Sequence, residues 1–271
     1  MKHVGFGVCA ILLGAFALAP ILWALSTSLK PYDEAVAFPP AWIPKHVSLK
    51  NFADVLFRSG MPRYCLNTGF VALGTIALTL VAAAHAGYAA ARHDFYGKQA
   101  LLFIILATTM IPGIAILVPL YLVSVKVHLH NTFTALILVF AAWQTPAVVW
   151  MLKGFFETVP PELEEAALLD GCTPLRAFYR ITLPLAQPGM AAAAVLVFMF
   201  VWSDFLLPFT LVTGDQKRLV SVGLYNFITA YGIEWPRLCA ALILALLPVL
   251  LLFLCVQRRF IAGLMAGAGK A

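Results

Sequence analysis

Six long apolar runs are the feature that most constrains how this chain can fold. They cover about residues 4–25, 66–90, 100–124, 132–152, 189–212 and 238–256. Each run has roughly the 20 residues that an α-helix needs to cross the hydrocarbon core of a bilayer. The runs are continuous rather than alternating, as expected for helices and not for the strands of a membrane barrel. The sequence therefore predicts an all-α integral membrane protein with six transmembrane helices.

The composition agrees with this fold class and excludes others. Hydrophobic residues make up 62% of the 271 residues and charged residues only 11%, whereas soluble domains carry about 25% charged residues. The longest gaps between runs, 26–65 and 153–188, are too short for a separate soluble domain, so we predict one transmembrane domain over 1–271. The net charge of +6 comes from scattered Lys and Arg residues, so we expect no nucleic-acid partner.

The orientation in the membrane is not set by the charges. With the N-terminus inside, the inner and outer segments carry nine Lys and Arg residues each, so the positive-inside rule is tied. The first run could be a cleaved signal peptide, because Lys2 and His3 give it a basic start. Its length of about 22 residues and its lack of an Ala-x-Ala cleavage pattern favour a retained span.

Prolines within the runs predict bends in the third to fifth spans. Proline removes a backbone hydrogen bond and can kink a helix, and such breaks suit a translocation path that moves. Prolines are also common in transmembrane helices without such a role. The residues concerned are Pro112, Pro119, Pro146 and Pro208.

An acidic segment, 157–188, separates the fourth and fifth runs and holds five of the twelve Asp and Glu residues of the chain. After Pro160 and Pro161, which end the preceding helix, three acids complement the N-terminus of a new helix. They are Glu162, Glu164 and Glu165. We expect this helix to be about eight residues long, roughly 12 Å, which is too short to cross a bilayer. Its acids would keep it in water, and Leu163, Ala166 and Ala167 would form a small-residue face.

A glycine turn and a second helix are predicted to follow. Gly171 is placed to end the first helix in the left-handed conformation. Thr173 and Pro174 provide a new N-cap and first turn, and Arg176 and Arg180 fall late in the second helix, where cations are favoured. The segment is therefore predicted to form a helix, a glycine turn and a helix.

The spacing in this segment resembles the EAA motif of ABC-importer permeases. The matching residues are Glu165-Ala166-Ala167, Gly171, Ile181 and Leu183-Pro184. Other stretches resemble the carbohydrate-uptake, maltose-type branch, and most of all its second permease subunit: 26–30, 38–44, 49–52, 202–205 and 257–260. The resemblance covers essentially the whole chain and departs at Ser203, where many relatives have Asn.

The resemblance implies a type I permease fold in a bacterial inner membrane, with both termini and the 157–188 loop in the cytoplasm. The loop would dock in a cleft of a separate ATPase and couple ATP hydrolysis to the spans. The coupling residues would be Glu165, Ala166, Ala167, Asp170, Gly171, Ile181, Leu183 and Pro184. The implied partners are a homologous second permease, two ATPase subunits, an extracytoplasmic substrate-binding protein and a sugar.

The chain shows no catalytic pattern of its own. The tail Gly-Ala-Gly-Lys-Ala lacks a phosphate loop, because Leu264 stands where Gly is needed and Ala271 where Ser or Thr is needed. His128 and His130 are not expected to bind a metal, and the five cysteines are interpreted as apolar fillers, although a Cys65–Cys239 pair is conceivable. We predict no bound cofactor; ATP and Mg²⁺ would be used by the partner ATPase.

Asp204 is the one clear carboxylate inside an apolar run. A charge inside a span is costly and by default indicates function, and its neighbours Trp202 and Ser203 combine stacking with hydrogen bonding, which suits a sugar. Asp204 could instead lie near the outer interface and pair structurally with a Lys or Arg. Further candidates for the substrate pathway are Thr108, Thr109, Trp143 and Gln144, each of which could also be a helix-packing group.

The residues leave three functions to compare. An ATP-driven sugar importer explains the 157–188 loop. An importer of glycerol phosphates or polyols fits the same family, but phosphate favours Lys or Arg in the pathway and the spans hold almost none. An ion-coupled secondary transporter would use Asp204 as the coupling carboxylate and leaves the loop unexplained.

Overall fold

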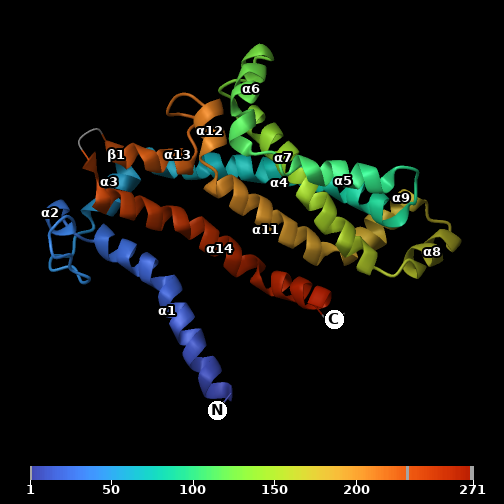
Figure 1. The fold of residues 1–271 in the computed structure, drawn as a ribbon, viewed down its shortest axis with the longest axis horizontal. Coiled ribbons are helices and arrows are strands. Elements are labelled where there is room, and N and C mark those ends of the chain that lie inside the picture. The colour runs from blue at the N-terminus through green and yellow to red at the C-terminus, as the bar shows by residue number, and fades with distance from the viewer. Residues whose placement is uncertain (1, 230–231, 269–271) are drawn as a thin grey trace. The chain divides into compact units, whose positions relative to one another are not determined.

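The computed structural model describes the backbone of residues 2–229 and 232–268, with side chains for 7, 9–229 and 232–255. The described backbone is mostly helical (Figure 1). Its contacts divide the chain into two compact units, Met1–Leu66 with Arg218–Leu250 and Asn67–Lys217 with Leu251–Ala271. Two long helices, α4 (Met61–Arg92) and α14 (Trp235–Ala268), contribute to both units. A single domain over 1–271 stays a prediction.

The first unit combines α1 and the first part of α14 with several short elements. These elements are α2 (Tyr32–Ala35), α3 (Lys50–Phe57), α13 (Val220–Leu224) and the 3-10 turn η2 (Tyr225–Phe227), while α1 covers Lys2–Ser28. Two short strands, β1 (Ile228–Thr229) and β2 (Gly232–Ile233), pair antiparallel with Ile228 opposite Ile233.

A buried lysine fixes the first loop of this unit. Lys30 is only 2% exposed. Its ammonium group donates to the carbonyl oxygen of Ala41 at 2.5 Å and lies 4.8 Å from the ring centroid of Trp23. Asn51 Nδ2 donates to the carbonyl oxygens of Ser28 and Lys30, both at 2.9 Å. Because a buried charge is costly unless it has partners, these contacts hold the loop against the end of α1.

The second unit is built around α7 (Phe133–Thr158), whose Phe140, Leu152 and Phe156 are fully buried. This helix packs against α5 (Lys98–Thr108), α11 (Gln187–Ser203) and α12 (Leu206–Leu211). The remaining elements are α6 (Gly113–Lys126), α8 (Glu162–Leu169), α9 (Pro174–Ala177), the π turn η1 (Phe178–Thr182), α10 (Leu183–Leu185) and most of α4.

Among the described residues, the predicted spans are found as four straight helices and two bent pairs. The straight helices are Cys9–Ser28, Met61–Arg92, Phe133–Thr158 and Trp235–Cys255. The bent pairs join Lys98–Thr108 to Gly113–Lys126 at 89° and Pro174–Leu185 to Gln187–Ser203 at 73°. Counting each bent pair as one span gives up to six spans, the predicted number.

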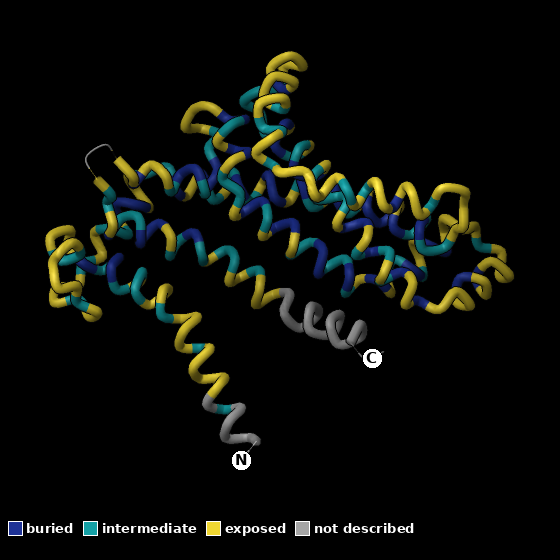
Figure 2. Tube along the Cα trace, in the orientation of Figure 1, coloured by how far each residue is buried: buried dark blue, intermediate teal, exposed yellow. Residues whose placement is uncertain are grey.

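The run 100–124 is broken at Pro112, one of the prolines for which the sequence predicts a bend. The helix ends at Thr108 and a new one begins at Gly113, directly after Pro112. Proline cannot donate a backbone hydrogen bond and disfavours helix in the residue before it, which accounts for the break. Pro119, by contrast, lies within α6 without ending it. Most residues of α6 are exposed (Figure 2).

A close backbone contact joins α4 to α7. A Cβ atom added at Gly87 would lie 3.1 Å from the backbone nitrogen of Lys153 and 3.2 Å from the carbonyl oxygen of Val149. Small residues at such crossings let helices approach closely in membranes. A side chain at this position would press on the backbone of α7, so glycine favours the close packing of the two helices.

We expect Gly87→Val to destabilise the protein by about 1–3 kcal/mol, because the added side chain would force the two backbones apart. Gly69→Val on the same helix is the matched control, since nothing lies within 4 Å of a Cβ at Gly69. The measurement is the melting temperature of the purified protein in detergent. Equal melting temperatures of the two variants would contradict the proposed packing.

Candidate functional site

The first half of the 157–188 loop folds as the sequence predicts. Helix α8 ends at Leu169, and Gly171 follows with a φ of +86°. Gly171 N donates to the carbonyl oxygen of Leu168 at 3.0 Å, and Cys172 N to that of Ala167 at 2.9 Å. These two bonds form a Schellman motif, the usual glycine C-cap. The predicted glycine turn is therefore confirmed.

The second half of the loop is more broken than predicted. Thr173 accepts a hydrogen bond from Arg176 N and caps α9, as expected. However, α9 ends at Ala177, and a π turn, Phe178–Thr182, replaces the regular second helix before α10. Pro184 lies just after this turn and has no N–H to donate to the preceding turn, so the regular ladder cannot continue through it.

Glu164 lies at the centre of a buried polar cluster, which we define as Glu164, Tyr88, Arg92 and Thr182. Its Oε1 accepts from Thr182 Oγ1 at 2.6 Å and from Arg92 Nε at 2.8 Å, and its Oε2 accepts from Tyr88 OH at 2.6 Å. Arg92 Nη2 also donates to the carbonyl oxygen of Val159 at 2.8 Å. The cluster joins α8 to the end of α4 and to η1.

The expectation that the acids of α8 all remain in water is therefore wrong for Glu164, which is 9% exposed. Hydrogen bonds from Thr182, Arg92 and Tyr88 take the place of the water molecules that would bind an exposed carboxylate. Burial raises the pKa of Glu164, but the hydrogen bonds from Thr182, Tyr88 and Arg92, together with the charge of Arg92, outweigh burial and hold this pKa below its ordinary value of 4.5. The carboxylate is therefore ionised at neutral pH.

Aromatic contacts add a second connection between the π turn and α4. Phe178 is 1% exposed, and its ring centroid lies 4.4 Å from that of Tyr88 and 6.0 Å from that of Phe156. Tyr179 OH lies 2.7 Å from Nε2 of His85, so this histidine packs against the turn. The π turn is thus held by rings as well as by the Glu164 cluster.

The predicted coupling residues differ in how far they are exposed. Ala167 is buried, and Ile181 and Leu183 are half-buried. The exposed members are Glu165, Ala166, Asp170, Gly171 and Pro184. Large apolar side chains lie beside them, including Leu169 at 90% exposed and Leu175 at 61% exposed. Leu169 ends the acidic helix α8 and Leu175 lies in α9; the sequence did not single out either residue.

The residues around Asp204 have structural partners. The helical part of the run 189–212 ends at Ser203, and Asp204 Oδ1 accepts from Leu207 N at 2.9 Å, so this carboxylate caps the first turn of α12. Ser203 Oγ donates to the carbonyl oxygen of Met199 at 2.8 Å, and the buried Trp202 stacks on Phe198. A substrate contact at these residues stays a prediction.

The other pathway candidates lie in the second unit. Thr108 and Trp143 meet at a cavity of about 340 Å³, whose lining residues from α5, α6 and α7 are otherwise apolar. The hydroxyls of Thr108 and Thr109 donate to carbonyls of their own helix turn, each at 2.6 Å. Gln144 is half-buried. The structure thus brings two of the four candidates to one cavity.

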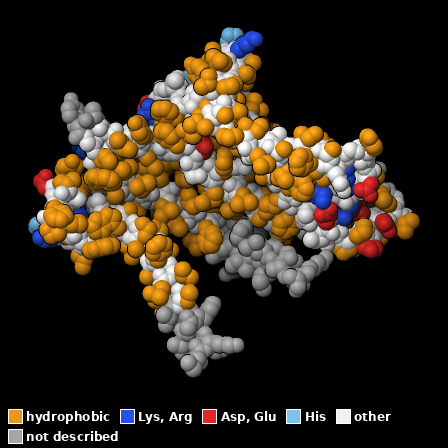
Figure 3. Space-filling view, viewed as in Figure 1, with side chains coloured by type: hydrophobic (Ala, Val, Ile, Leu, Met, Phe, Trp, Pro, Cys, Tyr) orange, Lys and Arg blue, Asp and Glu red, His pale blue; other side chains and the backbone are white. Residues whose placement is uncertain are grey.

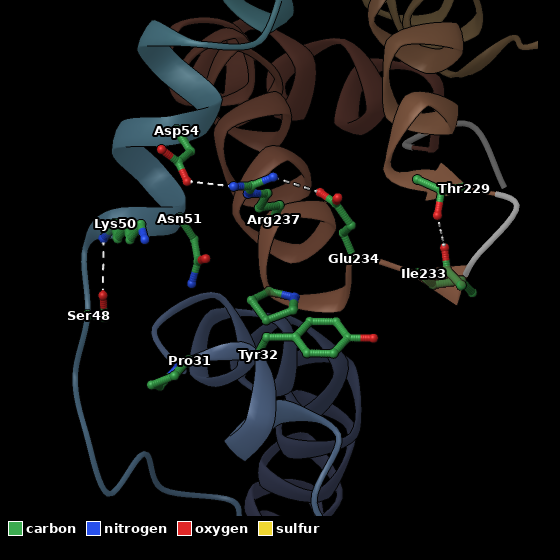
Figure 4. Close-up of a pocket in the computed structure, with 12 residues that line it drawn as sticks. Pro31, Tyr32, Ser48, Lys50, Asn51, Asp54, Thr229, Ile233, Glu234 and Arg237 are labelled. Carbon is green, nitrogen blue, oxygen red and sulfur yellow. Dashed lines mark hydrogen bonds and ion pairs between the residues drawn. The ribbon is translucent and has the colours of Figure 1, made fainter.

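The first unit contains an ion-pair cluster that was not predicted from the sequence. Arg237 at the start of α14 donates to Asp54 at 2.9 Å and to Glu234 at 3.1 Å (Figure 4). The three residues border a cavity of about 460 Å³ that Tyr32 and Asn51 also line. No local pattern could reveal the pair, because Asp54 and Arg237 are 183 residues apart.

The described residues hold no group of three or more His, Cys, Asp or Glu side chains that could bind a metal. All five cysteines are free, including Cys65 and Cys239. The 257–260 stretch and the C-terminal Gly-Ala-Gly-Lys-Ala have no described side chains.

Comparison with known families decides between the alternatives. The family described as "Binding-protein-dependent transport system inner membrane component" matches residues 81–264, which include the whole candidate loop. The chain belongs to this family. It is therefore a multi-pass component of an inner-membrane transport system, and the predicted family is confirmed.

Individual relatives cover nearly the whole permease. The sulfoquinovosyl glycerol transport system permease protein SmoH of Agrobacterium fabrum is 34% identical, covering 99% of this chain and 94% of that protein. The trehalose transport system permease protein SugB of Mycobacterium tuberculosis is 34% identical, covering 98% and 97%. The diacetylchitobiose uptake system permease protein DasC of Streptomyces coelicolor is 30% identical, covering 100% of both chains.

A solved structure confirms the predicted fold. It is a bacterial ABC transporter involved in the import of the acidic polysaccharide alginate, and one of its chains superposes with a TM-score of 0.81. The match covers 96% of this permease and 97% of that chain at 22% identity. The all-α fold of a type I ABC-importer permease is thus established.

We expect Glu164→Ala to destabilise the permease by about 3–5 kcal/mol, because it would leave Arg92 as a partly buried, unpaired charge. The control is Glu162→Ala, which removes an exposed acid from the same helix. Thermal unfolding in detergent measures both. Arg92→Leu combined with Glu164→Ala should recover part of the loss, as a double-mutant cycle would report. A loss no larger than that of Glu162→Ala would refute the structural role of the cluster.

The lowered pKa of Glu164 also predicts a pH dependence of stability. In the unfolded chain, Glu164 has the ordinary pKa of 4.5, and folding lowers this pKa. The ionised carboxylate therefore stabilises the folded state at every pH above 4.5. This stabilisation is lost as the pH falls below it, through the lower pKa of the folded state. The melting temperature of the wild type should therefore fall more steeply with acidification than that of Glu164→Gln. Parallel curves for the two proteins would show that Glu164 does not contribute in this way.

Proposed function

We propose that this permease is one of two membrane subunits of an ATP-driven ABC importer for a neutral sugar. The observation that carries the proposal is the contrast within α8: Leu169 is 90% exposed, whereas Glu164 is buried and bonded to Tyr88 and Arg92 of α4. Such a helix can contact a partner protein through its exposed residues and transmit the movement of that partner to α4 through Glu164. Two ATPase subunits, a homologous permease and an extracytoplasmic binding protein would complete the transporter.

Coupling would pass through the loop in two steps. The exposed residues of α8, Glu165, Ala166 and Leu169, would contact the ATPase, which binds ATP and Mg²⁺. Closure of the ATPase dimer would move α8, and the Glu164 cluster would transmit the movement to α4 and η1. Breaks at η1 and Pro112 offer places where the helices can change angle, since interrupted ladders are where helices bend.

The proposed substrate class rests on the relatives and on the cavity beside α5. Two relatives are named for the neutral sugars trehalose and diacetylchitobiose, and a third for sulfoquinovosyl glycerol, a sugar derivative with an anionic sulfonate. The relatives therefore support a sugar, and the choice of a neutral one rests on the cavity. The cavity that contains Thr108 and Trp143 has no charged lining residue, which favours a neutral sugar over a glycerol phosphate. An aromatic ring such as that of Trp143 suits the apolar face of a sugar ring.

An ion-coupled transporter is disfavoured by the partner of Asp204. Its carboxylate accepts a backbone hydrogen bond and caps α12, so it is engaged in holding the fold. Under the proposed function, the 157–188 loop and both termini lie in the cytoplasm, and the first unit's 29–60 segment lies outside.

The glycine turn provides the test of coupling. We expect Gly171→Val to reduce sugar uptake by about tenfold, because a β-branched residue cannot adopt the φ of +86° without strain of roughly 1–2 kcal/mol. Nothing lies within 4 Å of a Cβ at this position, so the effect would be one of backbone conformation. Uptake and binding-protein-stimulated ATPase activity are measured in the assembled transporter.

The matched control is Gly214→Val. Gly214 has a φ of +91° and equally open surroundings, but it lies outside the loop. We expect uptake by this variant to remain near the wild-type level. Normal uptake by an assembled Gly171→Val transporter would exclude a coupling role for the turn.

A further inference from the structure

We propose that a pocket between α5 and α7 binds the headgroup of an anionic phospholipid. The pocket, which we name the lysine pocket, has a volume of about 900 Å³ and is lined by eleven residues from the 94–106 segment and from α7. Its polar wall includes Lys98 and Lys153, and its apolar wall includes Leu102, Phe103 and Trp150. This site goes beyond the proposed transport function and does not depend on it.

Two lysines give the pocket its charge. The side chains of Lys98 and Lys153 are 20% and 17% exposed, so both ammonium groups are held close to the wall. Lys98 pairs with Asp94 at 3.0 Å, and Lys153 pairs with Glu157 at 2.5 Å. The acids are the more exposed partners, at 100% and 47%. Such surface ion pairs are weak, so a phosphate can replace them with charge-assisted hydrogen bonds.

The apolar wall continues along α5 as an exposed hydrophobic surface. Phe103 is 70% exposed, Ile104 61% and Leu106 41%. Trp150 is 37% exposed, and its indole Nε1 donates to the carbonyl oxygen of Leu102 at 3.1 Å. The acyl chains of a lipid can lie along this surface, while Trp and Lys side chains are typical of the interface between lipid and water.

The pocket lies where charged residues give way to apolar ones. Helix α5 begins at Lys98, six residues after α4 ends at Arg92, and Figure 3 shows charged side chains gathered at this end of the second unit beside the hydrophobic surface of α5. Within the pocket, Lys153 lies beside Trp150, with its Nζ 5.9 Å from the ring centroid, and Leu102, Phe103 and Leu106 supply apolar surface. A phospholipid carries the matching combination of an anionic phosphate and apolar acyl chains. Basic pockets between transmembrane helices bind anionic headgroups in this way.

A free phosphate would match only half of this site. It could contact Lys98 and Lys153, but it would leave the surface of Phe103 and Leu106 uncovered. A lipid satisfies both walls at once, which is why the geometry favours it over a soluble anion.

The test uses the assembled transporter in nanodiscs of phosphatidylcholine, with and without phosphatidylglycerol. We expect phosphatidylglycerol to raise the melting temperature by about 5 °C, the size expected for a ligand well above its dissociation constant. Native mass spectrometry should detect retained phosphatidylglycerol. Lys98→Gln combined with Lys153→Gln should lose both effects, whereas Lys126→Gln at the end of α6 should keep them. Lys98→Arg combined with Lys153→Arg should also keep the rise in melting temperature and the retained lipid. This variant distinguishes a loss of positive charge from a general disturbance of the fold.

Three results would overturn the proposal. The first is equal retention of phosphatidylglycerol by the wild type and the Lys→Gln double variant. The second is an equal rise in melting temperature with glycerol 1-phosphate, which would make the pocket a site for free anions. The third is a loss of co-purified ATPase from the double variant with no dependence on phosphatidylglycerol, which would make it a protein interface.

Discussion

The buried carboxylate of Glu164 is the constraint on which the candidate site depends. It belongs to a short helix whose other residues, apart from Ala167, are exposed, and it accepts hydrogen bonds from Tyr88, Arg92 and Thr182. An ionised group removed from water is stable only with such partners. Moving α8 away from α4 would separate the charges of Glu164 and Arg92, and moving it away from η1 would remove the hydrogen bond from Thr182. The helix therefore follows the spans as a fixed attachment, while its exposed leucines remain available to another surface.

The same principle recurs in the first unit. Lys30 is held by a carbonyl oxygen and a tryptophan ring, and Arg237 is held between Asp54 and Glu234. Apolar packing alone discriminates poorly between neighbouring helices in a membrane, because lipid tails are as apolar as leucine. Polar groups at the helix ends and close contacts such as that at Gly87 supply the missing specificity.

Basic residues of the second unit differ in how firmly their charges are paired. Arg92 is committed to Glu164 and to a backbone carbonyl, so it holds the fold. Among the described residues, the ion-pair partners of Lys98 and Lys153 are the exposed acids Asp94 and Glu157, and the proposed lipid would replace these partners. The difference lies in the burial of the partner, since a buried carboxylate cannot return to water without loss and an exposed one can.

The sequence by itself determined the features with local causes. Run length predicted the number of spans but not the breaks within two of them. Gly171 predicted the Schellman turn, and the motif spacing predicted the family. Tertiary structure decided the rest. Glu162, Glu164 and Glu165 are equivalent in the sequence, and only the fold selects Glu164, because its donors Tyr88 and Arg92 lie 76 and 72 residues away. The residues around Glu164 in the sequence do not reveal these contacts, because the contacts depend on which helices pack together in the folded chain.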